Sequence, residues 1–383
     1  MEELLLCAVG DVAAFFKEPE SMFVHTADIL NEADITFGQN ERHYTDRYTE
    51  RDLLPGVPIT EISPLAHAAA LKLGGFDVMS FASNHCMDLG GDAMLGTIAA
   101  LKDNGLVVIG AGKNIEEARK PAIFERKGTT IAYLAYCSVG RTGWEAGVDK
   151  SGCAPMRAST FYQQVDYQPG TPPEIISVAN RDDLAAAIED IKKVKASADI
   201  VVVSFHWGLH HVRGTLAMYE REVAHAVIDA GADLIVGHHP HVLKGIEIYK
   251  GKAVFYSMGN FAFDLPLSVR TQRQKKLGAK HAFNKVTGDP EYADWYSWPA
   301  ESRVSMIVKC RVANKKISRV SFLPVLINSR AQPVVVSQKD GFEKALGNIR
   351  ELSSSQGLNT EFCAESGEIV VRTRSPVPAE EES

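Results

Sequence analysis

The residues with the most evident chemistry are three histidines, His238, His239 and His241, in the segment Gly-His-His-Pro-His at positions 237–241. They follow the apolar run 233–236, which is typical of a buried strand, so the imidazoles are predicted to lie at a strand end. Neutral imidazole is a common ligand for divalent metals, and burying three imidazoles without partners would be costly. We predict His241 as a ligand, together with one or both of His238 and His239.

A second apolar run, residues 200–205, ends in His206, Trp207 and Gly208. A single histidine on an apolar strand is more often only packed in the core, but with His241 downstream we favour a ligand role for His206. His210 and His211 follow within a few residues. They are candidates for contacting a substrate, with a solvated helix start as the alternative.

Oxygen donors that would complete a metal centre follow other short apolar runs. These residues are Asp11, Glu41 and Asn84. A two-metal hydrolytic site needs mixed oxygen and nitrogen ligands and a bridging carboxylate, and Glu41 is the candidate bridge. The alternatives are a turn for Asp11, a surface ion pair for Glu41 and a loop cap for Asn84.

Further polar residues near these ligands are candidates for catalysis or substrate binding. His85 follows Asn84 and would be free to donate a proton, with Asp88 close enough in sequence to orient it. Asn260 either contacts substrate or turns the chain. Arg270 belongs to a basic cluster that would recognise an anionic substrate, although a charge run is more often a solvated face.

The alternation of apolar runs with amphipathic segments predicts an α/β fold whose site lies at the carboxyl ends of strands. Helices are expected at 21–31, 63–74 (with Ser63 as N-cap), 92–104, 182–196 and 216–230. Residues 1–330 are expected to form the main domain, with 268–299 as an insertion or lid over the site. Residues 331–383 are expected to be a C-terminal extension that ends in disorder.

Composition excludes several classes of protein. The chain has 383 residues and a net charge of −7, so no global field favours nucleic acid or an anionic membrane. No apolar stretch approaches the ~20 residues of a membrane helix. The six cysteines include no Cys-x-x-Cys pair, and the acidic N-terminus is unlike a secretory signal, so a cytoplasmic protein is expected.

At these residues the chain resembles bacterial capsule-synthesis proteins of the CapA/PgsA type, a branch of the calcineurin-like metallophosphoesterases. The motifs that carry the resemblance occur in this order: Gly10-Asp11, Ser83-Asn84-His85, His206-Trp207-Gly208, Gly237-His238-His239-Pro240-His241 and Ser257-Met258-Gly259-Asn260-Phe261. The resemblance covers roughly residues 4–326. It implies a four-layer α/β (α+β) sandwich of two sheets flanked by helices, a centre with two divalent metals (Mn, Fe or Zn), and a connection to poly-γ-glutamate.

The chain departs from the family pattern at several positions. Ala13 stands where calcineurin-like enzymes have the histidine of Asp-x-His, and Glu41 replaces their second aspartate. Gln39 and Lys244 replace an Asn and a Gln, His210-His211 stands where an acidic residue is usual, and no membrane anchor is expected. These differences favour a soluble reaction on another substrate over a role in capsule export.

The sequence therefore predicts a soluble metal-dependent hydrolase in which metal-activated hydroxide attacks a phosphoester or a related anionic, small-molecule or peptide-like substrate. One alternative is a metal-dependent epimerase or an amide-directed enzyme acting on poly-γ-glutamate-like substrates. Another is a non-catalytic assembly protein of capsule synthesis, which the missing histidine at Ala13 favours. No nucleic-acid or membrane partner is expected, and the oligomeric state is left open.

Overall fold

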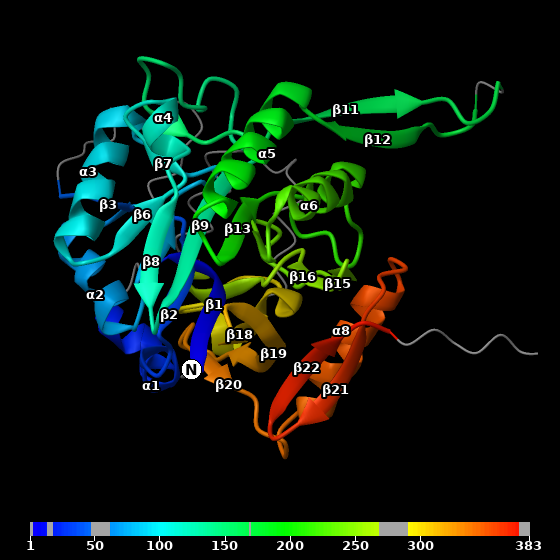
Figure 1. The fold of residues 1–383 in the computed structure, drawn as a ribbon. Helices are drawn as coiled ribbons and strands as arrows, with labels where there is room; N and C mark the ends of the chain where they lie inside the picture. Colours follow the sequence, from blue (N-terminus) through cyan, green and yellow to red (C-terminus); the bar gives the residue numbers. More distant parts are fainter. Residues whose placement is uncertain (1–2, 14–17, 47–61, 168–169, 268–289, 375–383) are drawn as a thin grey trace, which may run out of the picture.

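Two β-sheets form the centre of the computed structural model, which describes residues 3–13, 18–46, 62–167, 170–267 and 290–374 (Figure 1). The larger sheet runs β21 (Glu361–Glu365), β22 (Glu368–Arg372), β19 (Lys316–Ile327), β18 (Val304–Ala313), β1 (Leu4–Ala13), β2 (Ile35–Asn40), β5 (Val78–Ser80) and β6 (Val107–Ile109). In addition, β17 (Asn260–Phe263) pairs with β1, and β20 (Pro333–Val335) pairs with β19. The smaller sheet runs β15 (Ile246–Tyr249), β16 (Lys252–Phe255), β14 (Leu234–His238), β13 (Ile200–His206), β9 (Thr129–Cys137) and β8 (Ala122–Arg126).

Apolar side chains of the two sheets meet in one core. Phe37 of β2 stacks on Tyr133 of β9 with ring centroids 6.0 Å apart, and Phe124 of β8 meets the edge of the same tyrosine. The outer face of the larger sheet is covered by α1 (Ala27–Asn31), α2 (Ala68–Leu73) and α3 (Gly90–Asp103). The outer face of the smaller sheet is covered by α5 (Arg181–Lys195) and α6 (Met218–Ala230). The predicted arrangement of two sheets flanked by helices is confirmed.

The strands that carry the candidate residues run parallel to their neighbours. In the larger sheet β1, β2 and β5 are parallel, and in the smaller sheet β9, β13, β14 and β16 are parallel. All residues of β13 are buried because it lies between two parallel neighbours, which explains its continuous apolar sequence. Parallel strands deliver their carboxyl ends to the same edge, and the polar residues that follow them collect there.

Short elements complete the described part of the chain. Two-stranded pairs are formed by β3 (His43–Tyr44) with β4 (Ile62–Ser63), β7 (Ala111–Gly112) with β10 (Gly152–Cys153), and β11 (Ala158–Gln163) with β12 (Glu174–Ala179). The short helix α4 spans Ile115–Ala118. Within the described ranges, no helix has both the length and the apolar character that a membrane span requires.

Two of the predicted helices are wrong in their bounds. Ser63 ends β4 instead of capping a helix, because Pro64 adopts an extended backbone with ψ of 145°. A 3-10 turn then leads into α2 at Ala68. The segment 21–31 also divides, into a 3-10 turn at Pro19–Phe23 and the short α1.

The C-terminal segment adds to the larger sheet. After residue 331 the chain forms β20, α8 (Phe342–Ser354), β21 and β22, and β22 pairs with β19. Phe342, Leu346 and Ile349 of α8 are buried in the core shared by both sheets. Residues 375–383, and most of the expected insertion with Arg270, lie outside the described residues.

We expect Phe37→Ala to lower the free energy of unfolding by about 3–5 kcal/mol, because it leaves a cavity where the two sheets meet. Urea unfolding at neutral pH would measure the change. Ile123→Ala is the matched control, since Ile123 is 56% exposed on the outer side of β8. Its effect should stay within about 0.5 kcal/mol. Equal losses in the two variants would contradict this packing.

Candidate metal centre

The candidate ligands lie at the edge where strands of both sheets end. Asp11 lies near the end of β1, and Glu41 directly follows β2. His206 and His238 are the last residues of β13 and β14, and they are register partners. At this edge the backbone of Gly10 lies against the backbone of Gly259. A Cβ at Gly10 would lie 2.0 Å from the carbonyl oxygen of Gly259. Only glycine fits there.

The Glu41 carboxylate lies between two histidines of the other sheet. Its Oε1 is 3.2 Å from His206 Nε2, and its Oε2 is 3.7 Å from His241 Nε2. His206 Nε2 also lies 2.7 Å from Asn84 Oδ1. Glu41 therefore directs one oxygen to each of two groups of donors, and its side chain is fully buried.

Asp11 is the second carboxylate of the cluster. Its Oδ1 is 3.3 Å from His238 Nδ1, and its Oδ2 is 3.2 Å from His241 Nδ1. His241 Nδ1 is also 2.8 Å from Asn260 Oδ1, which places Asn260 beside the cluster. Donor atoms of Asp11, Glu41 and His206 all lie within 4.8 Å of one another. This spacing is short enough for the three residues to belong to one metal centre.

Several donor atoms here are buried without a hydrogen bond in the described part of the protein. These atoms are His206 Nδ1, His238 Nε2 and His239 Nδ1. Leaving such atoms unsatisfied is costly, and native proteins rarely do so. Cations would give the histidines partners, and a mixed nitrogen and oxygen set suits Mn, Fe or Zn without selecting among them. The residues therefore fit a divalent metal.

The protonation states also fit metal binding. Burial, reinforced by neighbouring imidazoles, holds the pKa of His206 well below its usual range and lowers the pKa of His239 to about 3. Burial alone would raise the pKa of Asp11, but contacts with His238 and His241 outweigh it and keep that pKa low. His206 and His239 are thus neutral and Asp11 is ionised at neutral pH, as metal ligands must be.

Three histidines of the site have an unusual backbone conformation. The φ angles are 94° for His239, 55° for His241 and 55° for His211. Non-glycine residues in this region are typically strained by ~1–3 kcal/mol each, and such strain concentrates at functional sites. The hydrogen bond from His211 N to the carbonyl oxygen of Pro240 (3.0 Å) joins two of these strained segments.

His85 and Asp88 form a pair beside the ligands. His85 Nδ1 is 2.7 Å from Asp88 Oδ2, so the carboxylate fixes the orientation of the imidazole. His43 Nε2 donates to the carbonyl oxygen of His85 at 2.9 Å. His43 was not among the predicted site residues, because its role depends on a contact between segments 42 residues apart.

The rim of the centre is aromatic and basic. The His210 ring lies 4.9 Å from the His239 ring, and the His211 ring lies 5.5 Å from the His241 ring. Trp298 covers the same place, with its ring 4.7 Å from His241. The sequence analysis gave Trp298 no individual role; it falls in the segment 268–299, which was expected to be an insertion or lid over the site.

The family departure at Lys244 has a structural role at this rim. The side chain is fully buried, and its Nζ donates to the carbonyl oxygens of Val212 and Thr215. These bonds hold the loop that follows His210 and His211. Burial lowers the pKa of Lys244 to about 8, while the nearby Glu220 favours the charged form.

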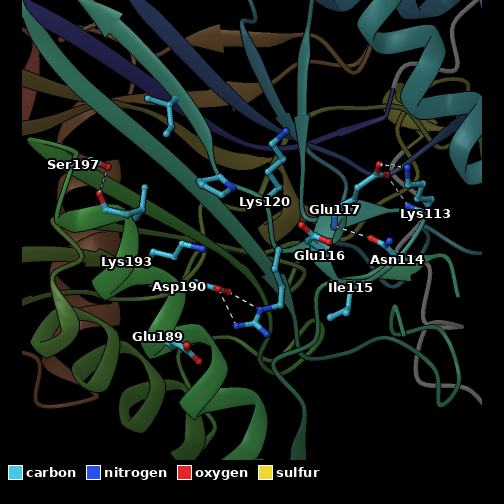
Figure 2. Close-up of a pocket in the computed structure, with 14 residues that line it drawn as sticks. Lys113, Asn114, Ile115, Glu116, Glu117, Lys120, Glu189, Asp190, Lys193 and Ser197 are labelled. Carbon is cyan, nitrogen blue, oxygen red and sulfur yellow. Dashed lines mark hydrogen bonds and ion pairs between the residues drawn. The ribbon is translucent and has the colours of Figure 1, made fainter. Parts of the chain in front are cut away.

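A separate pocket of about 900 Å³ lies between α4 and α5 (Figure 2). Its charges are mixed, and four of the charged residues form two ion pairs: Arg119 Nε lies 2.7 Å from Asp190 Oδ2, and Lys113 Nζ lies 3.0 Å from Glu117 Oε1. The candidate ligands do not line it. This pocket is therefore separate from the histidine-rich edge.

The sequence matches one known protein family over most of its length. The family described as "Bacterial capsule synthesis protein PGA_cap" matches residues 6–265. The "PGA biosynthesis protein CapA" of Bacillus subtilis (strain 168) is 33% identical over 251 residues, which is 65% of this chain and 58% of that protein. A "probable polyglutamine synthesis accessory protein" of Mycobacterium tuberculosis is 32% identical over 191 residues, 49% of this chain and 45% of that protein. The chain thus spans about half the length of these relatives.

Solved structures with a similar outline have low sequence identity. The calcineurin-like phosphoesterase YfkN from Bacillus subtilis covers 92% of this chain and 97% of its own, with 13% identity and a TM-score of 0.40. The NAD nucleotidase of Haemophilus influenzae covers 91% of this chain and 63% of its own, with 12% identity and a TM-score of 0.39.

We expect His241→Ala to lose at least one bound divalent metal per chain, because the imidazole contacts both Asp11 and Glu41. Elemental analysis after gel filtration would measure the metal content. His225→Ala is the matched control, because His225 pairs with Glu247 (3.1 Å), outside the cluster. Unchanged metal content in a folded His241→Ala protein would reject the centre.

Proposed function

Because this chain belongs to the bacterial capsule synthesis protein (PGA_cap) family, we propose that it is a metal-dependent hydrolase of phosphoesters or related anionic substrates. The observation that carries the proposal is the buried Glu41, whose two oxygens face His206 and His241 separately. A carboxylate shared between two sets of donors is what a two-metal hydrolytic site requires.

We assign the ligands to two groups that share Glu41. Asp11 and His241 would hold one cation with Glu41, while Asn84, His206 and His239 would hold the other. His238 lies 3.3 Å from Asp11 and offers an imidazole beside it, which compensates for the alanine at position 13. When bound, such cations supply Lewis acidity and make water more acidic near neutral pH.

Side chains around the ligands would perform the remaining steps. His85 is partly accessible, with 14% of its side chain exposed, and would donate a proton to the leaving group. Asp88 would hold the proton-bearing tautomer in place. His210 and His211 would contact the anionic group, Trp298 would limit access of water, and Asn260 would orient His241. Arg270, which lies outside the described residues, is proposed to contact an anionic substrate.

The cellular compartment is part of the same proposal. All six cysteines are free, and Cys7, Cys86, Cys137, Cys153 and Cys310 are buried. Free thiols are typical of reducing compartments, which supports the cytoplasm. The substrate is proposed to be a small molecule or a peptide-like anion.

We expect the metal-loaded protein to release the phenol from a panel of aryl phosphate monoesters and diesters, together with inorganic phosphate from the monoesters. His85→Asn should lower kcat by roughly 10²–10⁴-fold with metal content unchanged, because general acid catalysis typically contributes that much. Asp88→Asn should lower kcat less and move the basic limb of the pH profile to lower pH, because the carboxylate favours the protonated form of the general acid. His225→Asn should leave both the rate and the profile unchanged.

Two outcomes would overturn the hydrolase proposal. One is a fully metal-loaded protein without turnover on the whole panel, which would leave a non-catalytic assembly role. The other is deuterium uptake at a substrate carbon, without bond cleavage, on γ-glutamyl peptides; this would indicate the epimerase reaction.

A further inference from the structure

The hairpin of β11 and β12, with residues 164–167 beyond β11, forms an arm that extends away from the two sheets (Figure 1). Its base is fixed to the helical layer: Ala179 N donates to Glu222 Oε2 at 3.0 Å, and Arg157 Nε lies 2.7 Å from Asp183 Oδ2. Beyond this base, the residues of β11 from Ser159 onward are exposed. The arm is therefore held in place while its outer part projects into solvent.

The arm carries an unusual concentration of exposed large apolar side chains. The exposed fractions are Phe161 55%, Tyr162 74%, Val165 56%, Tyr167 91%, Ile175 62% and Val178 39%. Phe161 and Tyr162 are consecutive in the strand, so they lie on opposite faces of the hairpin. Exposed apolar clusters of this kind mark interaction sites, and aromatic residues are enriched in interfaces.

The outer edge of β11 lacks the features that normally prevent strand pairing. Its sequence, Ala-Ser-Thr-Phe-Tyr-Gln, contains no charged residue and no proline. Within the part of the chain that the structure describes, β11 pairs only with β12. Natural edge strands are usually protected by lysine, proline, a bulge or a covering element. The β11 edge is therefore available for a further strand.

We propose that β11 pairs antiparallel with β11 of a second copy of this chain, forming a four-stranded sheet across a two-fold axis. In such a pair a residue on the axis faces its own copy. With Phe161 on the axis, it would lie opposite the partner's Phe161, and Thr160 would lie opposite the partner's Tyr162. The pairing does not involve the metal centre, so it stands independently of the proposed hydrolase activity.

The exposed area suits an interface of this type. At ~150–250 Å² per fully exposed aromatic side chain, the exposed fractions of Phe161 (55%), Tyr162 (74%) and Tyr167 (91%) amount to roughly 400 Å². A standard interface buries ~800 Å² per partner. Edge-to-edge pairing covers only the part of this surface next to the neighbouring strand, so the interface falls at the low end of the size range, which suits a reversible dimer.

The charges of the arm favour this partner over a lipid surface. Asp166 and Glu174 lie toward the tip and are acidic, which disfavours contact with an anionic bilayer. In the antiparallel pair the two tips point in opposite directions, so these carboxylates do not meet their own copies. A second arm therefore fits both the apolar surface and the charge distribution.

Sedimentation velocity of the full chain over a range of concentrations tests the proposal. We expect a reversible dimer whose dissociation constant rises by roughly tenfold or more in Phe161→Glu and in Thr160→Lys, since each substitution acts twice across the axis. Leu73→Glu is the matched control, because Leu73 is 67% exposed on α2, and it should not change the dimer. Circular dichroism and metal content should be equal in all variants.

Cross-linking provides a second, positive test. Phe161→Cys, treated with a low-molecular-weight disulfide as oxidant, should give a disulfide-linked dimer, whereas Ile123→Cys on β8 should not. A wild-type protein that stays monomeric at all concentrations would overturn the proposal. So would a dimer that both arm substitutions leave intact, or anionic vesicle binding that Phe161→Glu abolishes in place of a dimer.

Discussion

The contact between the Glu41 carboxylate and two imidazoles of the opposite sheet is the interaction on which the site depends. Glu41 follows β2 of the larger sheet, while His206 ends β13 and His241 follows β14 of the smaller one. Burying a carboxylate is costly unless it is paired and solvated by fixed dipoles or cations. The cluster is therefore stable only where both sheets end together, and the sandwich has to be closed before the site exists.

The apolar core and the polar edge are consequences of the same strand arrangement. Parallel strands in the middle of the smaller sheet are largely apolar along their length because both faces are covered. Where those strands end, their side chains no longer have to be apolar, and the chain can place carboxylates and imidazoles there. The positive φ angles of His239 and His241 show that the backbone turns sharply at this point, under strain that the packed strands beneath it can support.

Departures from the family pattern occur where the structure offers compensation. Ala13 provides no imidazole, but His238 lies beside Asp11. Lys244 is buried and holds the loop after His210 and His211 through two carbonyl oxygens. The centre thus contains a set of donors that fits divalent metals without a histidine at position 13. The exposed arm of β11 and β12 lies apart from this centre and adds a surface that the site does not require.

The sequence by itself determined the α/β alternation, the strands that precede the candidate residues and the family, because apolar runs and short motifs are local signals. It also indicated Glu41 as the residue able to link two groups of ligands. Local signals did not predict that Ser63 ends a strand, which follows from the extended backbone of Pro64. They also did not predict β22 after residue 331, because that strand forms only by pairing with β19.

Only the tertiary structure decided which donors face one another. His238 contacts Asp11, while the ring of His239 lies 5.0 Å from the ring of His206. Neighbouring residues diverge in this way because His239 leaves the strand conformation at φ 94°, which the sequence pattern does not encode. The same holds for Trp298 over His241, since that contact joins segments that meet only when the sheets have packed.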